Sequence, residues 1–491
     1  MNKVPLYRNP LSRFAWVMAL MVFAITTILL LLDYLGVKLN PLIGMLAYTL
    51  FPALLIFYLF LIPIGMYREW RRRHRQIGEE APRFPRFDFN IKGHRIQLYV
   101  FILGTSLVGL LVLAVSFRAY EFTESVHFCG ELCHNVMKPE ATTYKASPHA
   151  RVACVQCHVG KGATWYVKSK LAGLYQVYAT IFNKYPRPIN TPISSLRPST
   201  DTCEECHWPS KFFGGRQIMR THYEEDENNT PRQFLMLLNV GGGLSPTGIH
   251  WHVGQDEVYY VARDKTRQDI PWVKVKYKNG REVTYVNSED PPKGEEMAKG
   301  ELRKMDCIDC HNRPTHIFRS PRVAMDEAIS AGLIDRNLPY VKKLGVDILS
   351  EKYTDNKTAK SSIRNSALAF YKDKYPQLAL DKAGLIEKTI SELQKIWEKN
   401  NFPEMKSDWT NYPNNIGHLT WPGCFRCHDG RHKNEKGETI KKECNTCHLF
   451  LSEKLSGLIT VKTSLGKPFE HPANVGGEER RSNCTSCHAG R

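Results

Sequence analysis

Residues 128–137 read FCGELCHNVM, with three residues between two cysteines and a histidine directly after the second cysteine. The same arrangement, with two residues between the cysteines, occurs six more times as C-x-x-C-H. The seven pairs use all fourteen cysteines of the chain: Cys129/Cys133, Cys154/Cys157, Cys203/Cys206, Cys307/Cys310, Cys424/Cys427, Cys444/Cys447 and Cys484/Cys487. The histidines that follow them are His134, His158, His207, His311, His428, His448 and His488. A pattern that accounts for every cysteine predicts one kind of site, repeated along the chain.

The motif is typical of c-type haem attachment, in which two thiols add to the haem vinyl groups and the adjacent imidazole binds the iron. A thioredoxin-like C-x-x-C needs no histidine, and a zinc site would combine two cysteine pairs and leave others over. We therefore expect seven covalently bound c-type haems, with iron as the metal.

Three uncharged apolar runs precede the first motif, at Phe14–Leu32, Leu39–Tyr67 and Ile96–Phe117. Each reaches the length of roughly 20 residues that is needed to span a bilayer as a helix. The first run is longer than the apolar part of a signal peptide, and no A-x-A-like cleavage site follows it. We expect three retained transmembrane helices, the second kinked or ended by Pro52 or Pro63.

The basic residues around these runs predict their orientation. The segment Tyr67–Arg95 holds nine Lys or Arg residues and four Asp or Glu residues. The N-terminus is also basic, whereas the loop between the first two runs has only Asp33 and Lys38. The positive-inside rule places the N-terminus and the loop 68–95 in the cytoplasm, and everything after Phe117 in the periplasm. The predicted location is the bacterial cytoplasmic (inner) membrane, with the haem domain in the periplasm.

The formal net charge of +18 would ordinarily indicate a polyanionic partner such as nucleic acid. Two propionates on each of seven haems would add about fourteen negative charges. Most of the positive excess therefore offsets the cofactors, and we expect no nucleic-acid partner.

The part after residue 117 has too few residues per motif for a separate apolar core around each haem, so the haems should form much of the core. Residues 256–286 alternate between apolar and polar and contain Asn279-Gly280, which predicts a small antiparallel sheet. Residues 322–400 have helical periodicity, which predicts two to four amphipathic helices.

The expected fold is a membrane-anchored multihaem cytochrome: three transmembrane α-helices plus a periplasmic, mainly α/irregular, haem-packed domain with a small antiparallel β insertion. The expected domains are a membrane anchor at 1–117, a region for haems 1–3 at 118–210, a β-containing insertion at 211–300, and a region for haems 4–7 with a helical scaffold at 301–491.

A haem iron used only for electron transfer is usually closed on both faces, commonly by two histidines. Outside the motifs and the cytoplasmic side, the candidates are His127, His149, His222, His250, His252, His316, His418, His432 and His471. The number of candidate histidines is close to the number of irons that need a second ligand, which argues against open, catalytic irons. We expect the second ligands to be His149, His252, His316, His418, His432 and His471. His316 and His432 follow their own motif histidines too closely to reach the opposite haem face, so each should bind a different haem.

The first motif, HARVACVQCHVG (149–160) and the lysine-bearing helix after it resemble the NapC/NirT family of membrane-anchored quinol dehydrogenases. The stretches CEECHWPSKFFG, IHWHV, CIDCHNRPTHIF and GCFRCHDGRH are similar to the larger seven-haem inner-membrane cytochromes of metal-respiring bacteria, the ImcH type. The family resemblance implies a first haem beside the quinol, bound by a methionine close after its motif. That methionine corresponds to Met137, whereas the plain motif favours His134, and we favour Met137.

The resemblance also implies roles for three other residues. His149 matches a histidine that binds the iron of another haem, and Lys170 in YVKSKLAGLYQVY matches the family's quinol-site lysine. The acidic partner of that lysine is Gln176 here, which leaves the proton acceptor open.

Quinol oxidation needs a nearby haem, a hydrogen-bonding group and a base with an exit to water. The candidates are Glu121, Glu124, His127, Lys170 and Gln176. We expect a quinol:cytochrome c-type oxidoreductase that oxidises menaquinol from the menaquinone pool. The electrons would pass through the seven haems to periplasmic c-type cytochromes or a periplasmic reductase.

Two other functions fit parts of the pattern. One is a passive, membrane-anchored electron carrier between protein partners, with no quinol site. The other is a nitrite or hydroxylamine reductase, but its usual sign, a lysine in place of a motif histidine, is absent from all seven motifs.

Overall fold

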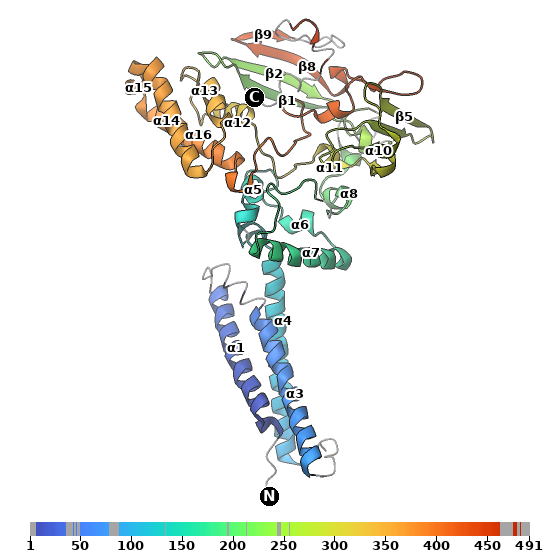
Figure 1. Cartoon of the computed structure of the whole chain (residues 1–491), viewed down its shortest axis with the longest axis vertical. Coiled ribbons are helices and arrows are strands. Elements are labelled where there is room, and N and C mark those ends of the chain that lie inside the picture. Colours follow the sequence, from blue (N-terminus) through green and yellow to red (C-terminus); the bar gives the residue numbers. More distant parts are fainter. Residues whose placement is uncertain are drawn as a thin grey trace. The chain divides into compact units, whose positions relative to one another are not determined.

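The structure is a computed structural model of the chain and describes residues 6–35, 43, 46, 50–77, 88–132, 134–193, 196–212, 214–242, 247–254, 256–461, 475–478 and 482. The chain divides into two compact units, Met1–Met137 and Lys138–Arg491 (Figure 1). The predicted membrane anchor, residues 1–117, lies within the first of these units.

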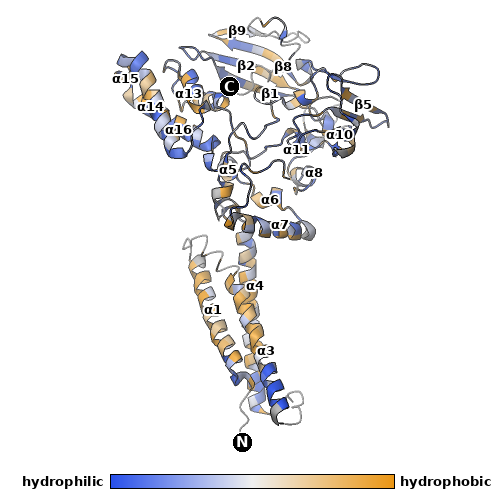
Figure 2. Ribbon diagram, in the orientation of Figure 1, coloured by the Kyte–Doolittle hydropathy of each residue, from blue (hydrophilic) through white to orange (hydrophobic). Residues whose placement is uncertain are grey.

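Three long apolar helices make up most of the first unit: α1 (Pro10–Tyr34), α3 (Phe51–Ile77) and α4 (Lys92–Glu124). The segments long and apolar enough to cross a membrane are Pro10–Leu32, Phe51–Arg73 and Lys92–Glu124 (Figure 2). Three such segments were predicted. The second helix continues past the predicted end at Tyr67 and takes up basic residues assigned to the loop 68–95, because arginine is a good helix former. The predicted start of that span, Leu39, lies outside the described residues.

Helices α1 and α3 pack closely against each other. Ser12 Oγ on α1 donates a hydrogen bond to the carbonyl of Ile62 on α3, at 2.9 Å. An added Cβ at Gly65 would lie 2.5 Å from Ser12 Oγ, so the contact requires glycine there. Pro63 lies inside α3 and does not end it.

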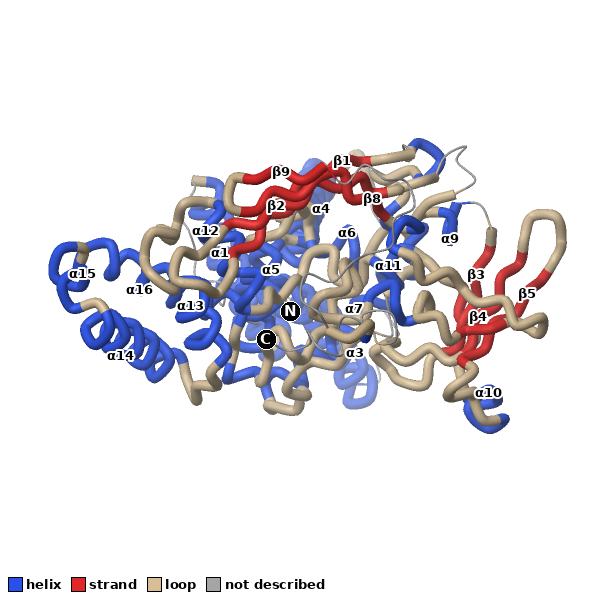
Figure 3. Tube along the Cα trace, turned by 90° about the horizontal axis from the view of Figure 1, so that it is seen from above, coloured by secondary structure: helices blue, strands red, loops and turns tan. Residues whose placement is uncertain are grey.

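The second unit contains two antiparallel sheets (Figure 3). One has the order β1-β2-β8-β9, with β1 (Arg216–Tyr223), β2 (Pro231–Leu238), β8 (His448–Leu455) and β9 (Leu458–Val461). The other has the order β6-β3-β4-β5-β7, with β3 (Glu257–Val261), β4 (Trp272–Lys276), β5 (Glu282–Asn287), β6 (Arg303–Lys304) and β7 (His432–Lys433). The predicted hairpin is β4–β5, which pairs Lys276 with Glu282 and turns at Gly280, where φ is +84°. Strands β8 and β9 lie in a region predicted to be helical scaffold and haem motifs.

A helical cluster fills the interval between the fourth and fifth motifs. It consists of α12 (Pro321–Ser330), α13 (Val341–Ser350), α14 (Asn356–Lys374), α15 (Pro376–Asp381) and α16 (Ala383–Asn400). Their apolar faces meet in a core that includes Met325, Ile363, Leu393 and Trp397. Fully burying one such side chain contributes about 1.5–3 kcal/mol, so this cluster has a conventional hydrophobic core.

A buried ion pair crosses this cluster. Lys342 Nζ on α13 lies 2.6 Å from Asp326 Oδ1 on α12, and the lysine side chain is 1% exposed. Asp326 also accepts a hydrogen bond from the backbone N–H of Tyr223 on β1, at 3.0 Å. Burial lowers the pKa of Lys342, and the nearby Asp326 carboxylate opposes this effect. The pair therefore ties two helices to the edge of the β1-β2-β8-β9 sheet.

We predict that Lys342→Met lowers the free energy of unfolding by roughly 3 kcal/mol, because it leaves the Asp326 carboxylate buried without its cation. The matched control is Lys343→Met, since Lys343 is 50% exposed and pairs with Asp347 on the surface. The control should change stability by less than about 1 kcal/mol. Thermal unfolding of both variants, followed by circular dichroism, measures the difference, and equal melting temperatures would contradict the prediction.

Candidate functional site

Short helical turns carry the described cysteine motifs. They include α6 (Cys154–His158), α8 (Ser199–Cys203), α11 (Cys307–Cys310), η6 (Gly423–Arg426) and η7 (Cys444–Thr446). Residues three apart on a helical turn lie on one side of it, so a turn with two intervening residues can present both thiols to one group.

The first motif has one more residue between its cysteines, and its local structure differs accordingly. Residues Phe128–Leu132, η3, form a π-helical turn. A π-helix has i→i+5 hydrogen bonds and so fits more residues into a turn than an α-helix does. The wider turn accommodates the extra residue of the first motif.

The motifs in the second unit follow one another in space in their chain order. Burial raises the pKa of Cys157, and Cys154 and Cys206 of the next motif contribute. A hydrogen bond between thiols joins Cys203 to Cys307 and raises the pKa of Cys203. The second to fourth motifs are therefore neighbours.

The series continues to the sixth motif. Burial, followed by the nearby Cys424, raises the pKa of Cys310 to about 12. A second hydrogen bond between thiols, from Cys447, lowers the pKa of Cys424 to about 7. The second to sixth motifs thus form a series of neighbours in chain order.

Each motif histidine in this series faces one histidine from elsewhere in the chain. The ring centroids are separated by 6.4 Å for His158 and His316, 6.1 Å for His207 and His149, 6.3 Å for His311 and His250, 5.8 Å for His428 and His252, and 6.2 Å for His448 and His418. A bond from a metal to an imidazole nitrogen is about 2 Å long, so two rings on opposite sides of one metal have centroids about 6 Å apart. The five spacings fit one metal ion between each pair of rings.

Backbone carbonyls orient several of these rings. The Nδ1 atoms of His149, His250, His252, His316 and His428 lie 3.2, 3.0, 2.8, 3.0 and 2.6 Å from the carbonyl oxygens of Pro314, Val240, Ile249, Glu140 and Lys441. A carbonyl only accepts, so Nδ1 carries the hydrogen and donates it. The lone pair then lies on Nε2, which is the tautomer that binds a metal through Nε2.

Burial also favours the uncharged form of His158 and His252. It lowers the pKa of His158 to about 4, with a smaller effect from His316. It lowers the pKa of His252 to about 4 as well, with a smaller effect from His428. Neutral imidazoles retain the lone pair that a metal requires.

The segment IHWH (249–252) differs from its prediction. Of its two histidines, His252 was expected to bind an iron and His250 was not. In the structure, His250 faces His311 of the fourth motif and His252 faces His428 of the fifth. Each also donates to a carbonyl through Nδ1, so one ring can both form a hydrogen bond and bind iron.

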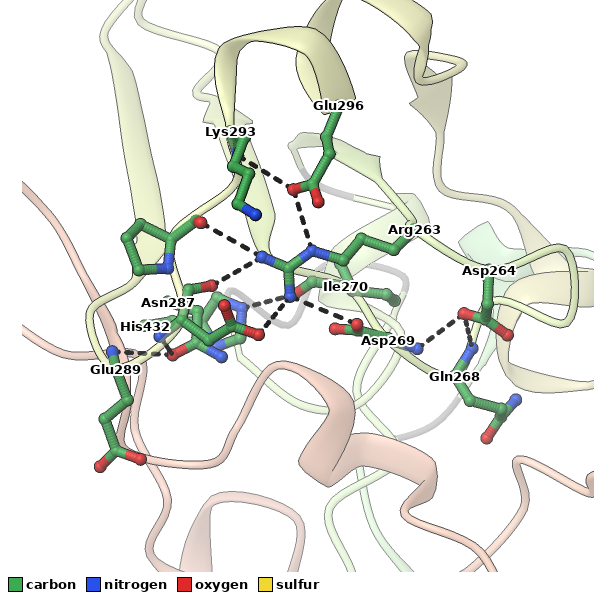
Figure 4. A network of polar contacts seen from close by, with 12 residues as sticks. Arg263, Asp264, Gln268, Asp269, Ile270, Asn287, Glu289, Lys293, Glu296 and His432 are labelled. Atoms are coloured by element: carbon green, nitrogen blue, oxygen red, sulfur yellow. Dashed lines mark hydrogen bonds and ion pairs between the residues drawn. The ribbon is translucent and has the colours of Figure 1, made fainter.

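His432, predicted as an iron ligand, has a different environment (Figure 4). Its Nδ1 lies 2.9 Å from Asp429 Oδ1, and its Nε2 lies 2.7 Å from the carbonyl oxygen of Ile270. The side chain is 1% exposed. Oxygen atoms lie within hydrogen-bond distance of both ring nitrogens, so in this geometry neither nitrogen of His432 faces a metal site, and the predicted ligand role gains no support here. His432 instead joins the fifth motif's loop to the β6-β3-β4-β5-β7 sheet.

Several predicted residues of the first unit lie around the end of α4. Glu121 forms an exposed ion pair with Arg118, at 2.9 Å. His127 Nδ1 lies 2.6 Å from Glu131, and Glu124 is the last residue of α4. Met137 is half-buried, one turn after position 134 in α5 (His134–Lys145).

The other two predicted quinol-site residues lie on α7 (Ala163–Ile181) in the second unit. Lys170 is half-buried, with Nζ 4.9 Å from the ring centroid of Tyr166. Gln176 is exposed on the same helix.

Five predicted residues lie outside the described residues: Cys133, His471, Cys484, Cys487 and His488. The described part of the chain likewise excludes the side chains of His134 and Cys444.

The histidine pairs fit a haem better than a metal ion without a porphyrin. Within the described residues, no group of three or more His, Cys, Asp and Glu side chains could hold a metal ion. Two imidazoles would suffice if a porphyrin supplied the other ligands. Arg197 adds a further sign, because its buried Nε and Nη1 have no hydrogen-bond partner among the described residues. Its guanidinium lies against Gly160, just after the second motif. A haem propionate at this position could accept hydrogen bonds from the guanidinium.

Sequence reasoning missed two residues inside motifs. Asp309, between the cysteines of the fourth motif, is buried and accepts hydrogen bonds from Arg303 Nε at 2.9 Å and Tyr260 Oη at 2.6 Å. Arg426, between the cysteines of the fifth motif, donates to the Asp309 carbonyl at 2.6 Å. These bonds tie the fourth motif to both the sheet and the fifth motif. The sequence feature that could have indicated these roles is the charged residue between the two cysteines of each motif, in CIDC and CFRC.

Comparison with known proteins places the chain in a family. The model of the NapC/NirT cytochrome c family, N-terminal region, matches residues 92–190. The cytochrome c-type protein ImcH of Geobacter sulfurreducens is 46% identical over 484 residues, which are 98% of this chain and 95% of that protein. The cytochrome c nitrite reductase subunit NrfH of Nitratidesulfovibrio vulgaris is 27% identical over 107 residues, 22% of this chain and 66% of that protein. No solved structure gives a significant match.

The family implies covalently bound c-type haem, and the three apolar helices supply the membrane anchor. The resemblance inferred from the motifs is confirmed over nearly the whole chain. The chain belongs to the NapC/NirT cytochrome c family and is a membrane-anchored, multihaem cytochrome of the inner membrane.

Proposed function

We propose that the chain oxidises menaquinol and passes the electrons through seven c-type haems to periplasmic c-type cytochromes or a periplasmic reductase. The haem domain, after residue 117, lies on the periplasmic side in this proposal. The support is the family, the seven motifs and the basic flanks of the apolar helices.

The observation that carries the electron-transfer part is the pairing of imidazoles. We assign His158 and His316 to the second haem, His207 and His149 to the third, His311 and His250 to the fourth, His428 and His252 to the fifth, and His448 and His418 to the sixth. An iron with a ligand on both faces has no position for nitrite or hydroxylamine. The pairing therefore favours a path for electrons over a small-molecule reductase.

Haem iron, when bound, accepts and releases one electron at a time. The protein's own contribution is to fix the order of the sites. Hydrogen bonds between thiols link the third motif to the fourth and the fifth to the sixth. Electrostatic interactions between thiols relate the second motif to the third and the fourth to the fifth. Such a series lets electrons move between neighbours along the chain order.

The first and seventh haems complete the proposed path. We propose Cys129 and Cys133 as attachment residues of the first haem, with Met137 or His134 as its ligand. For the seventh we propose Cys484, Cys487 and His488, with His471 as the second ligand. These assignments rest on the motif spacing and on the family resemblance.

The quinol part of the proposal rests on residues that can exchange protons. We propose that Lys170 hydrogen-bonds a quinol oxygen, and that Glu121, Glu124 or His127 accepts a proton. Gln176 stands where the family has an acid, so it can hydrogen-bond but cannot act as the base.

Replacing His250 should open one iron. We predict that His250→Ala gives one high-spin haem, because the fourth iron loses a ligand while its thioether bonds remain. Electron paramagnetic resonance of the oxidised protein measures the change.

The matched control for this experiment is His432→Ala, which should leave every haem low-spin because His432 bonds to Asp429 and Ile270. The assignment fails if His250→Ala stays fully low-spin, or if His432→Ala produces the high-spin signal.

The number of haems can be counted directly. We predict that intact mass spectrometry of the purified chain shows seven haem additions, since all fourteen cysteines belong to motifs. A homogeneous preparation with six or fewer additions would overturn the count.

Lys170→Gln should slow haem reduction by a menaquinol analogue about tenfold. The expected effect is smaller than the usual 10²–10⁴-fold contribution of a general acid–base group, because Lys170 is proposed to hydrogen-bond the quinol and not to accept its proton. Lys168→Gln is the matched control, because Lys168 lies on the same helix with Nζ 4.9 Å from the Trp165 ring centroid. Both variants should be reduced normally by dithionite. If the unmodified chain is not reduced by the quinol at all, it is a passive electron carrier.

A further inference from the structure

Helix α7 (Ala163–Ile181) presents a row of large apolar side chains to the outside. The row consists of Val167, Leu171, Leu174, Tyr178 and Ile181, which follow one another at helical spacing. Leu174 is 68% exposed and Ile181 is 70% exposed. Residues spaced by three and four lie on one face of a helix, so this is a continuous apolar face.

The most buried positions of α7 lie away from this row and carry small residues. Ala179 is buried, and Ser169, Ala172 and Thr180 are partly buried. A surface helix in water shows the reverse pattern, with its apolar face inward and its polar face outward. The inverted pattern indicates that something apolar covers the outer face.

The charges around α7 indicate what that cover is. Residues 141–200 contain eight Lys or Arg residues and no Asp or Glu. Lys168 and Lys170 lie within the helix, and Lys184 and Arg187 follow it. A basic, acid-free segment is attracted to anionic phospholipid headgroups.

The aromatic residues of α7 agree with the charges. Trp165, Tyr166, Tyr175 and Tyr178 all belong to the helix. Tryptophan and tyrosine are enriched where lipid tails meet water, because their rings are apolar and carry a polar group. Basic residues, aromatic rings and an apolar face together are typical of a helix that lies in the membrane interface.

We propose that α7 lies on the surface of the bilayer that holds the three transmembrane helices, with the row from Val167 to Ile181 buried at the boundary between headgroups and lipid tails. Lys168, Lys170, Lys184 and Arg187 lie at the level of the anionic headgroups. The proposal depends on the membrane anchor and not on quinol chemistry, so it holds even if Lys170 takes no part in quinol oxidation.

The test places a photoreactive residue on the apolar face. Leu174 is replaced by p-benzoylphenylalanine in the full, haem-loaded chain, reconstituted in vesicles of phosphatidylglycerol and phosphatidylethanolamine. Leu107, exposed within the α4 span, is the positive control, and Leu380, exposed on α15, is the negative control. Haem content equal to that of the unmodified chain verifies folding of each variant.

After illumination, mass spectrometry identifies what position 174 has bound. We expect lipid adducts at position 174 in a yield similar to position 107 and several-fold above position 380. The proposal is overturned if position 107 gives lipid adducts and position 174 does not. It is also overturned if the main adduct at position 174 is a peptide, from residues 10–124 of the same chain or from a second copy.

Discussion

The architecture of the second unit depends on pairs of imidazoles that come from separate parts of the sequence. In the proposed assignment, His158 and His316 would hold the same haem and so join one motif to a distant segment. The helical cluster α12–α16 has its own core around Leu393 and Trp397 and can be stable without such links. The motif segments are mostly short turns and loops, so in this assignment cofactor ligation would supply what a hydrophobic core supplies elsewhere.

The short segment 250–252 connects two motifs at once. Two residues apart, His250 and His252 face motif histidines whose motifs are more than a hundred residues apart in sequence. The same two motifs are joined again by the hydrogen bond from Arg426 to the Asp309 carbonyl. Two independent links therefore fix the fourth and fifth motifs relative to each other. A fixed separation matters for electron transfer, because rearrangement at each step would slow it.

Three features were predictable because each depends on a short, local stretch of sequence: the cysteine motifs, the three apolar helices and the Asn279-Gly280 hairpin. The histidine partners were only partly predictable. Spacing excluded His316 from its own haem, but it could not show that His432 turns both nitrogens toward Asp429 and Ile270. Nor could it show that His250 and His252 face different motifs, because a partner across the fold is set by the path of the whole chain. Strand β8 was missed since it begins at His448, inside a motif read only for its chemistry.

The proposals for α7 and for Lys170 constrain each other through helix geometry. Lys170 precedes Leu174 by one turn, so it lies at the margin of the apolar row and not on the inward face. If lipid covers that row, the Lys170 ammonium lies where headgroups meet lipid tails. A quinol dissolved in the bilayer can bring its oxygens to that depth, and a proton released there has a short path to water. A lysine at the same position on a helix surrounded by water would meet no quinol, so the membrane contact supplies the substrate access that the chemistry of Lys170 requires.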